Sequence, residues 1–432
     1  MSISIENLRQ TLSGLLTHQA REAGLEDSVA GVLPRIVVEP ATEEEVATVL
    51  AFADRAGLKV LVRGGGTQLG LGLPPAGGDI LLSTSRLDKV LEHEPHDQTI
   101  SVQSGIRLAN LQGYLAQTRQ WLAIDSPLPG AATIGGIIST NISGARRLRF
   151  GAVRDQIIGI RIVLADGTIA KGGGKVVKNV AGYDLAKLFC GALGTLGVVV
   201  AASFRLYPLP KCRRTVVLTS SSPALLCEVA LKVSASTLVP TAIDLLGPGD
   251  GQSPCRLAIR FESGVPAAVE DQSDAVVELA GELAGSAHVL ADEEEASFWT
   301  SADDWTGRAP DESNTLVLKA SLLPTQVSPW LARLDSAIAA AGLASRWRGH
   351  LGHGTVYARL SGSEAALSGV VNELRTLAEA ERGSLVVQDA PPGLARALDV
   401  WGAVAAVDLM RRVKARFDPH VTLNPGRYIG GI

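Results

Sequence analysis

PLPGAATIGGIISTNISGARRL, residues 127–148, combines glycines with small hydroxyl and amide side chains in a composition that suits neither a regular helix nor a regular strand. Glycine lets the backbone approach a ligand closely and adopt positive φ without steric cost. A loop that exposes successive backbone N–H groups forms a concave site for an anion. The stretch is therefore predicted to form half of a pyrophosphate cradle. The alternative interpretation is a glycine-rich loop between core elements.

A second glycine-rich loop, RGGGTQ at residues 63–68, follows a short buried strand predicted at residues 59–62. Such a loop offers backbone donors together with one cationic side chain, Arg63. It is not a Walker A loop, because no Gly-Lys-Ser/Thr follows, and it lacks the glycine spacing of the Rossmann fingerprint. Two loops of this kind, roughly 70 residues apart, could hold the two ends of one long dinucleotide.

The composition predicts a folded chain without nucleic-acid partners. Of the 432 residues, 46% are hydrophobic and 19% charged, which suits two or three domains with buried cores. The net charge is −4 and aromatic residues make up 4%, so neither a basic patch nor a stacking platform for bases is expected. The four cysteines show no C-x-x-C spacing, so we expect neither an iron–sulfur cluster nor a secreted disulfide framework in this chain.

The sequence gives no sign of export or of a membrane span. The first residues contain no basic region followed by an apolar core. The longest uncharged run, residues 188–204, is interrupted by three glycines and is predicted to form a helix end, a turn and a strand. We expect a cytoplasmic protein. Peripheral attachment to the inner membrane through partners is the alternative.

Both glycine loops resemble the FAD-binding domain of the vanillyl-alcohol oxidase family, also called the PCMH-type family. The resemblance continues through FGAVRDQIIGIRIVLADG (residues 150–167) and VKNVAGYDLAKLFCGALGTLGV (residues 177–198), and it ends with DPHVTLNPGR (residues 418–427). It covers roughly residues 30–210 and the last fifteen residues well, and the middle poorly. Within the family, the chain is most similar to the FAD-bearing E subunits of bacterial glycolate oxidases, which work with a catalytic FAD subunit and an iron–sulfur subunit.

The resemblance implies an α+β protein with two domains. A two-lobed PCMH-type FAD-binding domain is expected over residues 1–210, completed by residues 417–432. The segment 211–416 alternates predicted strands and helices without glycine clusters, which suits two β-α-β-like units on an antiparallel sheet. It would be the ferredoxin-like α+β cap of the family. Within it, the acidic run 292–295 is predicted to be the first turn of a solvated helix.

The resemblance also implies non-covalent FAD. Some family members tether the cofactor through a histidine or cysteine in the first loop, but Gln68 and Leu69 stand there and no such nucleophile occurs between Arg63 and Pro75. A link elsewhere, through His93 or His96, is the alternative. The residues expected to contact FAD are Arg63, Gly64, Gly65, Gly66, Thr67, Gln68, Pro129, Thr133, Gly135, Gly136, Ser139, Asn141, Gly144, Gly197, Val198 and Asn424.

Two of these residues have specific alternatives. Arg63 could offset phosphate charge, pair with a carboxylate near the loop, or be an ordinary surface arginine. Asn424 is expected near the flavin ring by resemblance, and otherwise forms an Asx-Pro turn. For the small polar residues of the cradle, ordinary turn chemistry is the competing explanation.

A second motif, GHLGHGTVY at residues 349–357, resembles the GHxGDGNxH motif of FAD-dependent D-2-hydroxy-acid dehydrogenases. There, two histidines and a downstream glutamate hold a metal that binds the substrate. His350 matches the first histidine, whereas His353 replaces the aspartate and Tyr357 the second histidine. We therefore predict no metal.

Substrate chemistry at this motif would need a carboxylate clamp and a proton acceptor. Arg348 could bind a carboxylate bidentately, and His350 or His353 could accept the hydroxyl proton. The alternative is an alternating strand with a charged outer face and two histidines that are hydrogen-bonded or exposed.

Three functions follow as hypotheses. The first is an FAD-carrying subunit of a glycolate oxidase-type complex, in which glycolate is oxidised to glyoxylate and the electrons pass to an iron–sulfur partner. The second is a self-sufficient FAD-dependent D-2-hydroxy-acid dehydrogenase that uses His350 or His353. The third is a scaffold with degenerate flavin loops and no redox activity.

Overall fold

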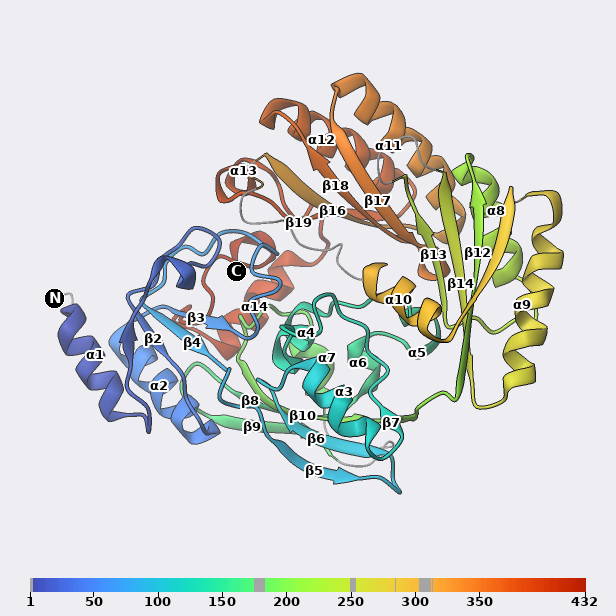
Figure 1. The fold of residues 1–432 in the computed structure, drawn as a ribbon. Coiled ribbons are helices and arrows are strands. Elements are labelled where there is room, and N and C mark those ends of the chain that lie inside the picture. Colours follow the sequence, from blue (N-terminus) through green and yellow to red (C-terminus); the bar gives the residue numbers. More distant parts are fainter. Residues whose placement is uncertain (1–2, 175–182, 249–253, 284, 303–311, 313) are drawn as a thin grey trace. The chain divides into compact units, whose positions relative to one another are not determined.

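The fold was obtained as a computed structural model, which describes residues 3–174, 183–248, 254–283, 285–302, 312 and 314–432. Residues 177–182, part of one family motif, thus lie outside the described residues. The chain divides into two compact units (Figure 1). The first comprises residues 1–142, 152–208 and 404–432, and the second comprises residues 143–151 and 209–403. Compared with the boundaries expected from the sequence, residues 143–151 belong with the second unit and residues 404–416 with the first.

The first lobe of the first unit is a four-stranded sheet of order β1-β2-β4-β3, in which β2, β4 and β3 run parallel. Thr42 accepts a hydrogen bond from the Glu45 amide and begins α2, and Gly57 ends α2 with φ of 68°. The elements are α1 (Ile5–Gly14), β1 (Arg21–Glu22), η1 (Leu25–Asp27), β2 (Ile36–Val38), α2 (Glu43–Ala56), β3 (Val60–Arg63) and β4 (Ile80–Ser83). Strand β3 leads directly into the first glycine loop.

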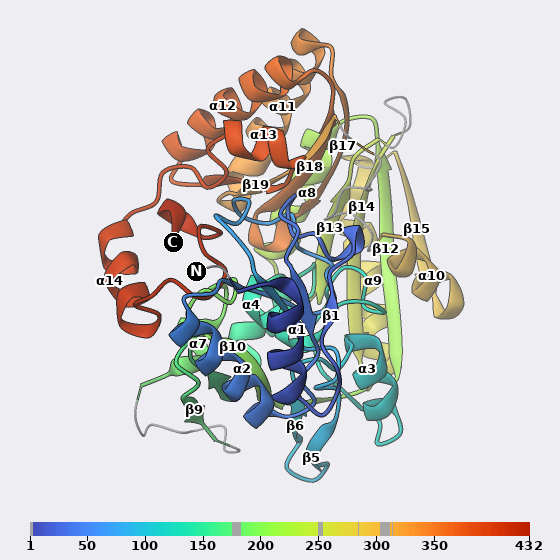
Figure 2. The same ribbon diagram turned by 90° about the vertical axis from the view of Figure 1, so that its left-hand side faces the viewer.

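The second lobe is a five-stranded antiparallel sheet of order β5-β6-β10-β8-β9. Its strands are β5 (Val90–Glu94), β6 (Thr99–Gln103), β8 (Ile157–Val163), β9 (Ile169–Gly173) and β10 (Val198–Arg205). Its other elements are α3 (Leu108–Ala116), β7 (Gln120–Trp121), α4 (Ile134–Thr140), α6 (Val153–Gln156), α7 (Leu185–Phe189), β11 (Tyr207–Pro208), α14 (Val407–Phe417) and η5 (Ile429–Gly431). Figure 2 shows this unit from the side, with α1 and α2 near one another.

Strand β10 joins the cores of the two lobes. Val198 and Val200 are buried in the core that also holds the apolar stripe of α2. Val199 and Phe204 are buried in the core beneath α3 and α4. Successive side chains of a strand point to opposite faces, so one strand serves both cores and fixes the lobes against each other.

The second unit is an eight-stranded antiparallel sheet of order β15-β12-β14-β13-β17-β18-β16-β19. It consists of two β-α-β-β-α-β repeats, each with the ferredoxin-like strand order, joined where β13 pairs with β17. The first repeat contains β12 (Cys212–Ser220), α8 (Pro223–Ser234), β13 (Ala242–Leu246), β14 (Cys255–Ser263), α9 (Pro266–Ala280) and β15 (Ser286–Ala291). The second contains β16 (Thr315–Ser321), α11 (Val327–Ala341), β17 (Ala344–His350), β18 (Thr355–Ser361), α12 (Glu364–Ala380) and β19 (Ser384–Asp389). The predicted α+β class and the ferredoxin-like arrangement are confirmed.

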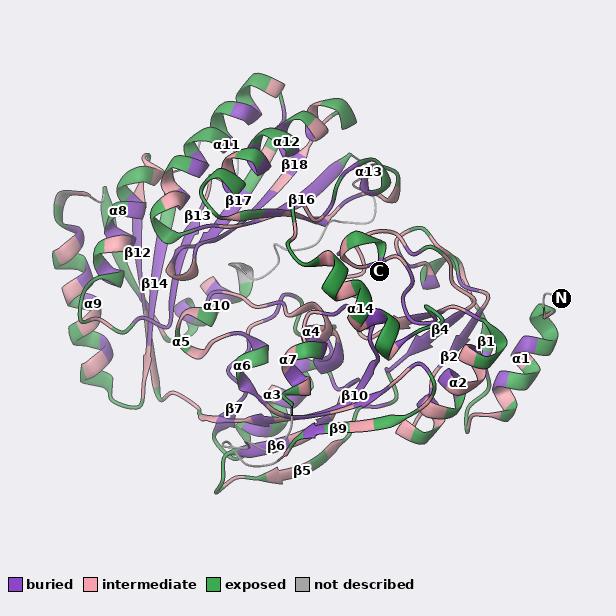
Figure 3. Cartoon of the chain, turned by 180° about the vertical axis from the view of Figure 1, so that it is seen from behind, coloured by how far each residue is buried: buried purple, intermediate pink, exposed green. Residues whose placement is uncertain are grey.

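The helices of the two repeats bury one stripe and expose the other (Figure 3). The remaining elements of this unit are α5 (Arg147–Phe150), η2 (Gly281–Leu283), α10 (Asp292–Ala302), η3 (Pro324–Gln326), η4 (Leu351–His353) and α13 (Pro392–Ala397). No helix of the chain, as far as it is described, combines the length and the apolar character needed to cross a membrane.

Helix α10 corrects one expectation from the sequence. The acidic run at its start was expected to be solvated, but Glu295 is fully buried. Its carboxylate accepts hydrogen bonds from Arg260 Nη2 (3.0 Å) and from the Thr215 hydroxyl (3.1 Å). A buried carboxylate remains stable only when it is paired in this way. Sequence periodicity could not identify Arg260, which lies on a strand 35 positions away.

We therefore predict that Glu295→Gln lowers the free energy of unfolding by about 3 kcal/mol, because it removes the carboxylate nearest to the buried Arg260 and leaves only Glu262, at 3.8 Å, to compensate that charge. Glu293→Gln, at an exposed position of the same helix, is the matched control and should change the free energy by less than about 0.5 kcal/mol. Chemical denaturation followed by circular dichroism measures both. Equal effects of the two substitutions would show that Glu295 is not a structural ion pair.

Candidate functional site

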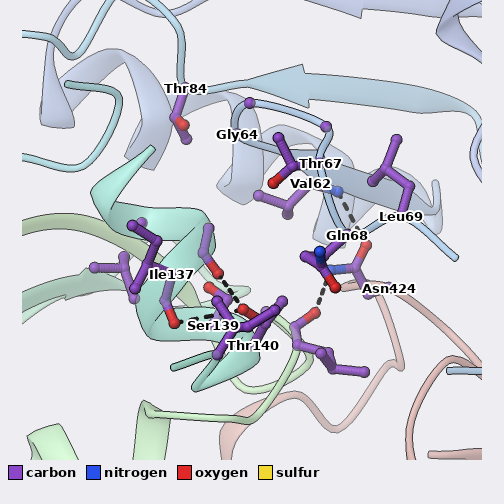
Figure 4. Close-up of a pocket in the computed structure, with 18 of the residues that line it drawn as sticks. Val62, Gly64, Thr67, Gln68, Leu69, Thr84, Ile137, Ser139, Thr140 and Asn424 are labelled. Carbon is purple, nitrogen blue, oxygen red and sulfur yellow. Dashed lines mark hydrogen bonds between the residues drawn. The ribbon is translucent and has the colours of Figure 1, made fainter. Parts of the chain in front are cut away.

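The two glycine loops line one cavity of the first unit. The cavity is partly open to solvent. Figure 4 shows Thr67 and Gln68 of the first loop beside the same hollow as Ser139 and Thr140 of α4. The residues predicted from the sequence that line it are Gly64, Gly65, Gly66, Thr67, Gln68, Gly135, Gly136, Ser139, Gly197, Val198 and Asn424.

A single hydroxyl group links the two loops. Thr133 begins α4, and its Oγ1 accepts hydrogen bonds from the backbone N–H of Gly65 (3.2 Å) and of Gly136 (3.3 Å). The loops are so close that a Cβ at Gly65 would lie 1.8 Å from the Ala131 carbonyl oxygen. Thr133 itself is buried and is not among the residues that line the cavity. It therefore shapes the cradle rather than facing a ligand.

Asn424 fastens the C-terminal segment to the floor of the cavity. Its Oδ1 accepts from the Val62 N–H (2.9 Å), and its Nδ2 donates to the Leu193 carbonyl (2.7 Å). The residue is buried, with φ of 42°, a conformation that asparagine tolerates better than most residues. Figure 4 shows the bond to Val62 as a dashed line. Asn424 thus connects β3 to the turn after α7 and holds these two segments together at the cavity wall.

Arg63 adopts the second of its expected roles, pairing with a carboxylate. Its Nη2 donates to Asp27 Oδ1 (2.9 Å), and it is not among the residues that line the cavity. Asp27 also binds Arg21 (2.6 Å). The Arg21 hydrogen bond is the largest influence on the Asp27 carboxyl, and with the other donors it outweighs burial and lowers the pKa to about 2. Arg63 is therefore bound to a carboxylate of the protein that it shares with Arg21.

Arg427 is a cavity residue that the sequence analysis did not select. It is 5% exposed, and its Nη2 donates to the carbonyls of Leu69 (2.9 Å) and Leu71 (2.6 Å). Its Nη1 is buried without a hydrogen-bond partner in the described part of the chain. Burial lowers the pKa of this guanidinium to about 10, a value at which it remains charged at neutral pH. The signal was present in the sequence, since Arg427 closes the DPHVTLNPGR segment.

The remaining residues divide into two groups. Pro129, Asn141 and Gly144 were predicted to contact the cofactor but are not among the residues that line the cavity. Asn141 instead ends α4 with φ of 50°. Lining residues that the sequence gave no reason to choose include Val62, Thr84, Ser126, Ile137, Thr140, Leu193 and Gly194. No cysteine or histidine is among the described residues that line this cavity. Non-covalent attachment of the cofactor stays a prediction.

These observations fit a bound dinucleotide with an anionic centre. The cradle has backbone N–H groups near α4, small side chains at the wall and a buried arginine, Arg427, whose Nη1 has no hydrogen-bond partner among the described residues. A buried charged donor without a partner costs several kcal/mol, which an anionic ligand would offset. Residues 64–68, Ser139 and Arg427 are the groups that would hold it.

A second cluster lies in the other unit, where β13 and β17 join the two repeats. Asp244 is fully buried, and its Oδ1 lies 2.5 Å from His350 Nδ1. Its Oδ2 accepts from Arg348 Nε at 2.7 Å and also from Arg348 Nη2. Burial opposes ionisation of Asp244, but the charges of Arg348 and His350 outweigh it and lower the pKa to about 2. Asp244 was not identified from the sequence, because it lies more than 100 positions before the motif.

This cluster changes the roles expected of the motif. Arg348 already holds a carboxylate of the protein, which corrects its assignment as a free clamp for substrate. His353 has both ring nitrogens within hydrogen-bonding distance of partners, Nδ1 to the Thr355 hydroxyl (3.1 Å) and Nε2 to the Gly144 carbonyl (3.3 Å). Burial, then the charges of His350 and Arg147, lower its pKa to about 3, so it is neutral at pH 7. It has no free nitrogen to accept a proton.

The same region does not fit a bound metal. Tyr357 is buried and stands where the motif of the metal-dependent enzymes has a second histidine, with its ring 5.7 Å from that of His350. Within the described ranges, no group of three or more His, Cys, Asp or Glu side chains could hold a metal ion. Of the two histidines of the motif, only His350 has a ring nitrogen, Nε2, without a hydrogen-bond partner in the described structure. This nitrogen is not among the fully buried polar atoms that lack a partner.

Comparison with known proteins agrees with this site. Residues 34–173 match the model for the FAD binding domain, and residues 398–428 match that for the C-terminal domain of FAD linked oxidases. The glycolate oxidase subunit GlcD of Bacillus subtilis is 25% identical and covers 91% of this chain and 89% of its own length. The D-lactate dehydrogenase of Archaeoglobus fulgidus is 28% identical, with 91% of both chains covered.

A solved structure of alkyldihydroxyacetonephosphate synthase has the same fold. It superposes with a TM-score of 0.74 and covers 98% of this chain and 86% of its own, at 16% identity. The glycine loops, the buried cation of the cavity and both domain matches thus agree on the cofactor, which is FAD. The chain thus contains one region similar to the FAD binding domain and another similar to the C-terminal domain of FAD linked oxidases.

Proposed function

We propose that this chain is the FAD-carrying subunit of a glycolate oxidase-type complex, which oxidises glycolate or a similarly small 2-hydroxy acid to the 2-oxo acid. A catalytic FAD subunit would react with the substrate, and an iron–sulfur subunit would receive the electrons. The relatives support this class of substrate, since one is a glycolate oxidase subunit and another a D-lactate dehydrogenase. Bound FAD supplies the electron acceptor, and the protein contributes its position.

One observation supports a role in which the chain carries FAD and depends on a partner subunit for catalysis. The cavity of the first unit is lined by both glycine loops, whereas two of the three side chains expected to act on substrate bind other groups of the protein. Arg348 is bound to Asp244, and His353 is bound to Thr355 and Gly144. A carboxylate substrate would have to displace the buried Asp244 to reach Arg348, and that exchange is unfavourable because it leaves a buried charge unpaired. The geometry therefore supports cofactor binding more strongly than independent turnover.

A second candidate function, a self-sufficient 2-hydroxy-acid dehydrogenase, is favoured by His350. Asp244 binds Nδ1 at 2.5 Å and so fixes the tautomer and orientation of the ring, which leaves Nε2 open to accept the hydroxyl proton. In this case the chain would need no catalytic partner. The two functions differ in what the isolated chain can do.

The first prediction concerns the isolated chain. Purified alone, it should be yellow and contain FAD, but it should reduce a dye with glycolate or D-lactate at less than about 1% of the rate of the complex, because the substrate-binding groups are occupied. Purification with the catalytic and iron–sulfur subunits should restore activity. Steady-state dye reduction, assayed chain by chain, decides the matter. Full activity of the chain alone would exclude the first function.

The second prediction applies if the chain alone does turn over substrate. His350→Gln should then lower kcat by roughly 100-fold or more, because it removes the proton acceptor. His353→Gln is the matched control from the same turn and should retain kcat within about threefold, because both nitrogens of His353 serve the protein. Circular dichroism and FAD content verify that both variants are folded. Equal losses in the two variants would contradict the assignment of His350.

A further inference from the structure

Arg63 and Arg427 are the two arginines of the first unit that we compare as partners for the negative charge of the cofactor. They differ in their ion pairing and in whether they line the cavity. Arg63 belongs to the glycine loop, but Asp27 binds it at 2.9 Å and it does not line the cavity. Arg427 comes from the C-terminal segment, lines the cavity and is 5% exposed. No carboxylate within the described ranges forms an ion pair with Arg427, and burial accounts for the whole change in its pKa.

The guanidinium group of Arg427 is hydrogen-bonded to the protein through Nη2 but not, among the described residues, through Nη1. Nη2 is fixed by the carbonyls of Leu69 and Leu71, which belong to the chain that follows the first glycine loop. The backbone is fixed as well, since the Leu73 N–H donates to the Arg427 carbonyl at 3.0 Å and the Ala76 N–H to the Pro425 carbonyl at 2.8 Å. The side chain is therefore held in place before any ligand arrives, and Nη1 is buried without a partner among the described residues.

We propose that Arg427, and not Arg63, supplies the positive charge of the FAD cradle, through an Nη1 group that donates to a negatively charged oxygen of the cofactor. Preorganised donors of this kind bind anions strongly, because no side-chain freedom is lost on binding. The oxygen is either on the pyrophosphate or on the pyrimidine edge of the flavin, which becomes negatively charged on reduction. The inference rests on FAD and not on the identity of the substrate, so it stands even if the proposed function fails.

The test is FAD binding to apoprotein prepared from the full chain, measured by the change in flavin fluorescence. Arg427→Gln should raise the Kd for FAD by about 10- to 100-fold, as expected for the loss of a charge-assisted hydrogen bond. Arg427→Lys retains the charge and should raise the Kd by less than about tenfold. Arg63→Gln is the matched control and should leave the Kd within about threefold, although it removes one partner of the buried Asp27.

Two fragments of the cofactor separate the two possible sources of negative charge. ADP carries the adenosine and the pyrophosphate without the flavin, and riboflavin carries the flavin and its ribityl chain without any phosphate. If Arg427 binds the pyrophosphate, Arg427→Gln weakens competition by ADP as much as it weakens FAD. If it binds the flavin edge, ADP is unaffected and the reduction potential of bound FAD becomes more negative. Either result supports the proposal.

The proposal is overturned if Arg427→Gln, folded by circular dichroism, binds FAD within twofold of the unmodified chain. It is equally overturned if Arg63→Gln weakens FAD binding more than Arg427→Gln does. A lower melting temperature of the apoprotein alone would mark Arg427 as a structural residue. The comparison with Arg427→Lys separates loss of charge from loss of the bonds to Leu69 and Leu71.

Discussion

The close approach of two glycine loops determines the rest of the first unit. A Cβ at Gly64 would lie 2.3 Å from Thr133 Oγ1, and one at Gly65 would lie 1.8 Å from the Ala131 carbonyl oxygen. Side chains are therefore excluded at these positions by the protein itself. The same contact lets one threonine hydroxyl accept from both loops. The glycines at positions 64 and 65 are thus required first for close packing of one loop against the other, and the cavity forms where the two loops meet.

Buried carboxylates decide which cationic groups remain available for ligands. Asp27 binds Arg63 together with Arg21, Asp244 binds Arg348, and Glu295 binds Arg260. Arg63 and Arg348, which the sequence analysis selected as candidates for binding a ligand, are thus already bound to carboxylates of the protein, and removing one partner of a buried ion pair is destabilising. Arg427, whose Nη1 has no hydrogen-bond partner in the described part of the chain, lines the cavity. Ion pairing with carboxylates of the protein thus distinguishes structural arginines from an arginine that can bind a negatively charged cofactor.

Local patterns predicted much of the fold and part of the site. The first glycine loop, the helix that ends at Gly57 and the alternating elements of the second unit follow from periodicity and turn chemistry, and the structure confirms the α+β class and the ferredoxin-like repeats. The second glycine-rich stretch was expected to contain no regular helix, but Ile134–Thr140 within it form α4. Asp244 and Glu295 could not be assigned, because their roles depend on partners that only strand pairing brings together. The excursion of residues 143–151 into the second unit had no local signal either.

The central claim is that the meeting of the two glycine loops forms the FAD cavity, and one measurement tests it most directly. This is the Kd for FAD of Gly65→Ala, compared with Gly130→Ala, whose added Cβ would have no atom within 4 Å. The account predicts that Gly65→Ala raises the Kd by about tenfold or more, because the methyl group forces the loops apart, while Gly130→Ala leaves it unchanged. Equal affinities in the two variants would contradict it.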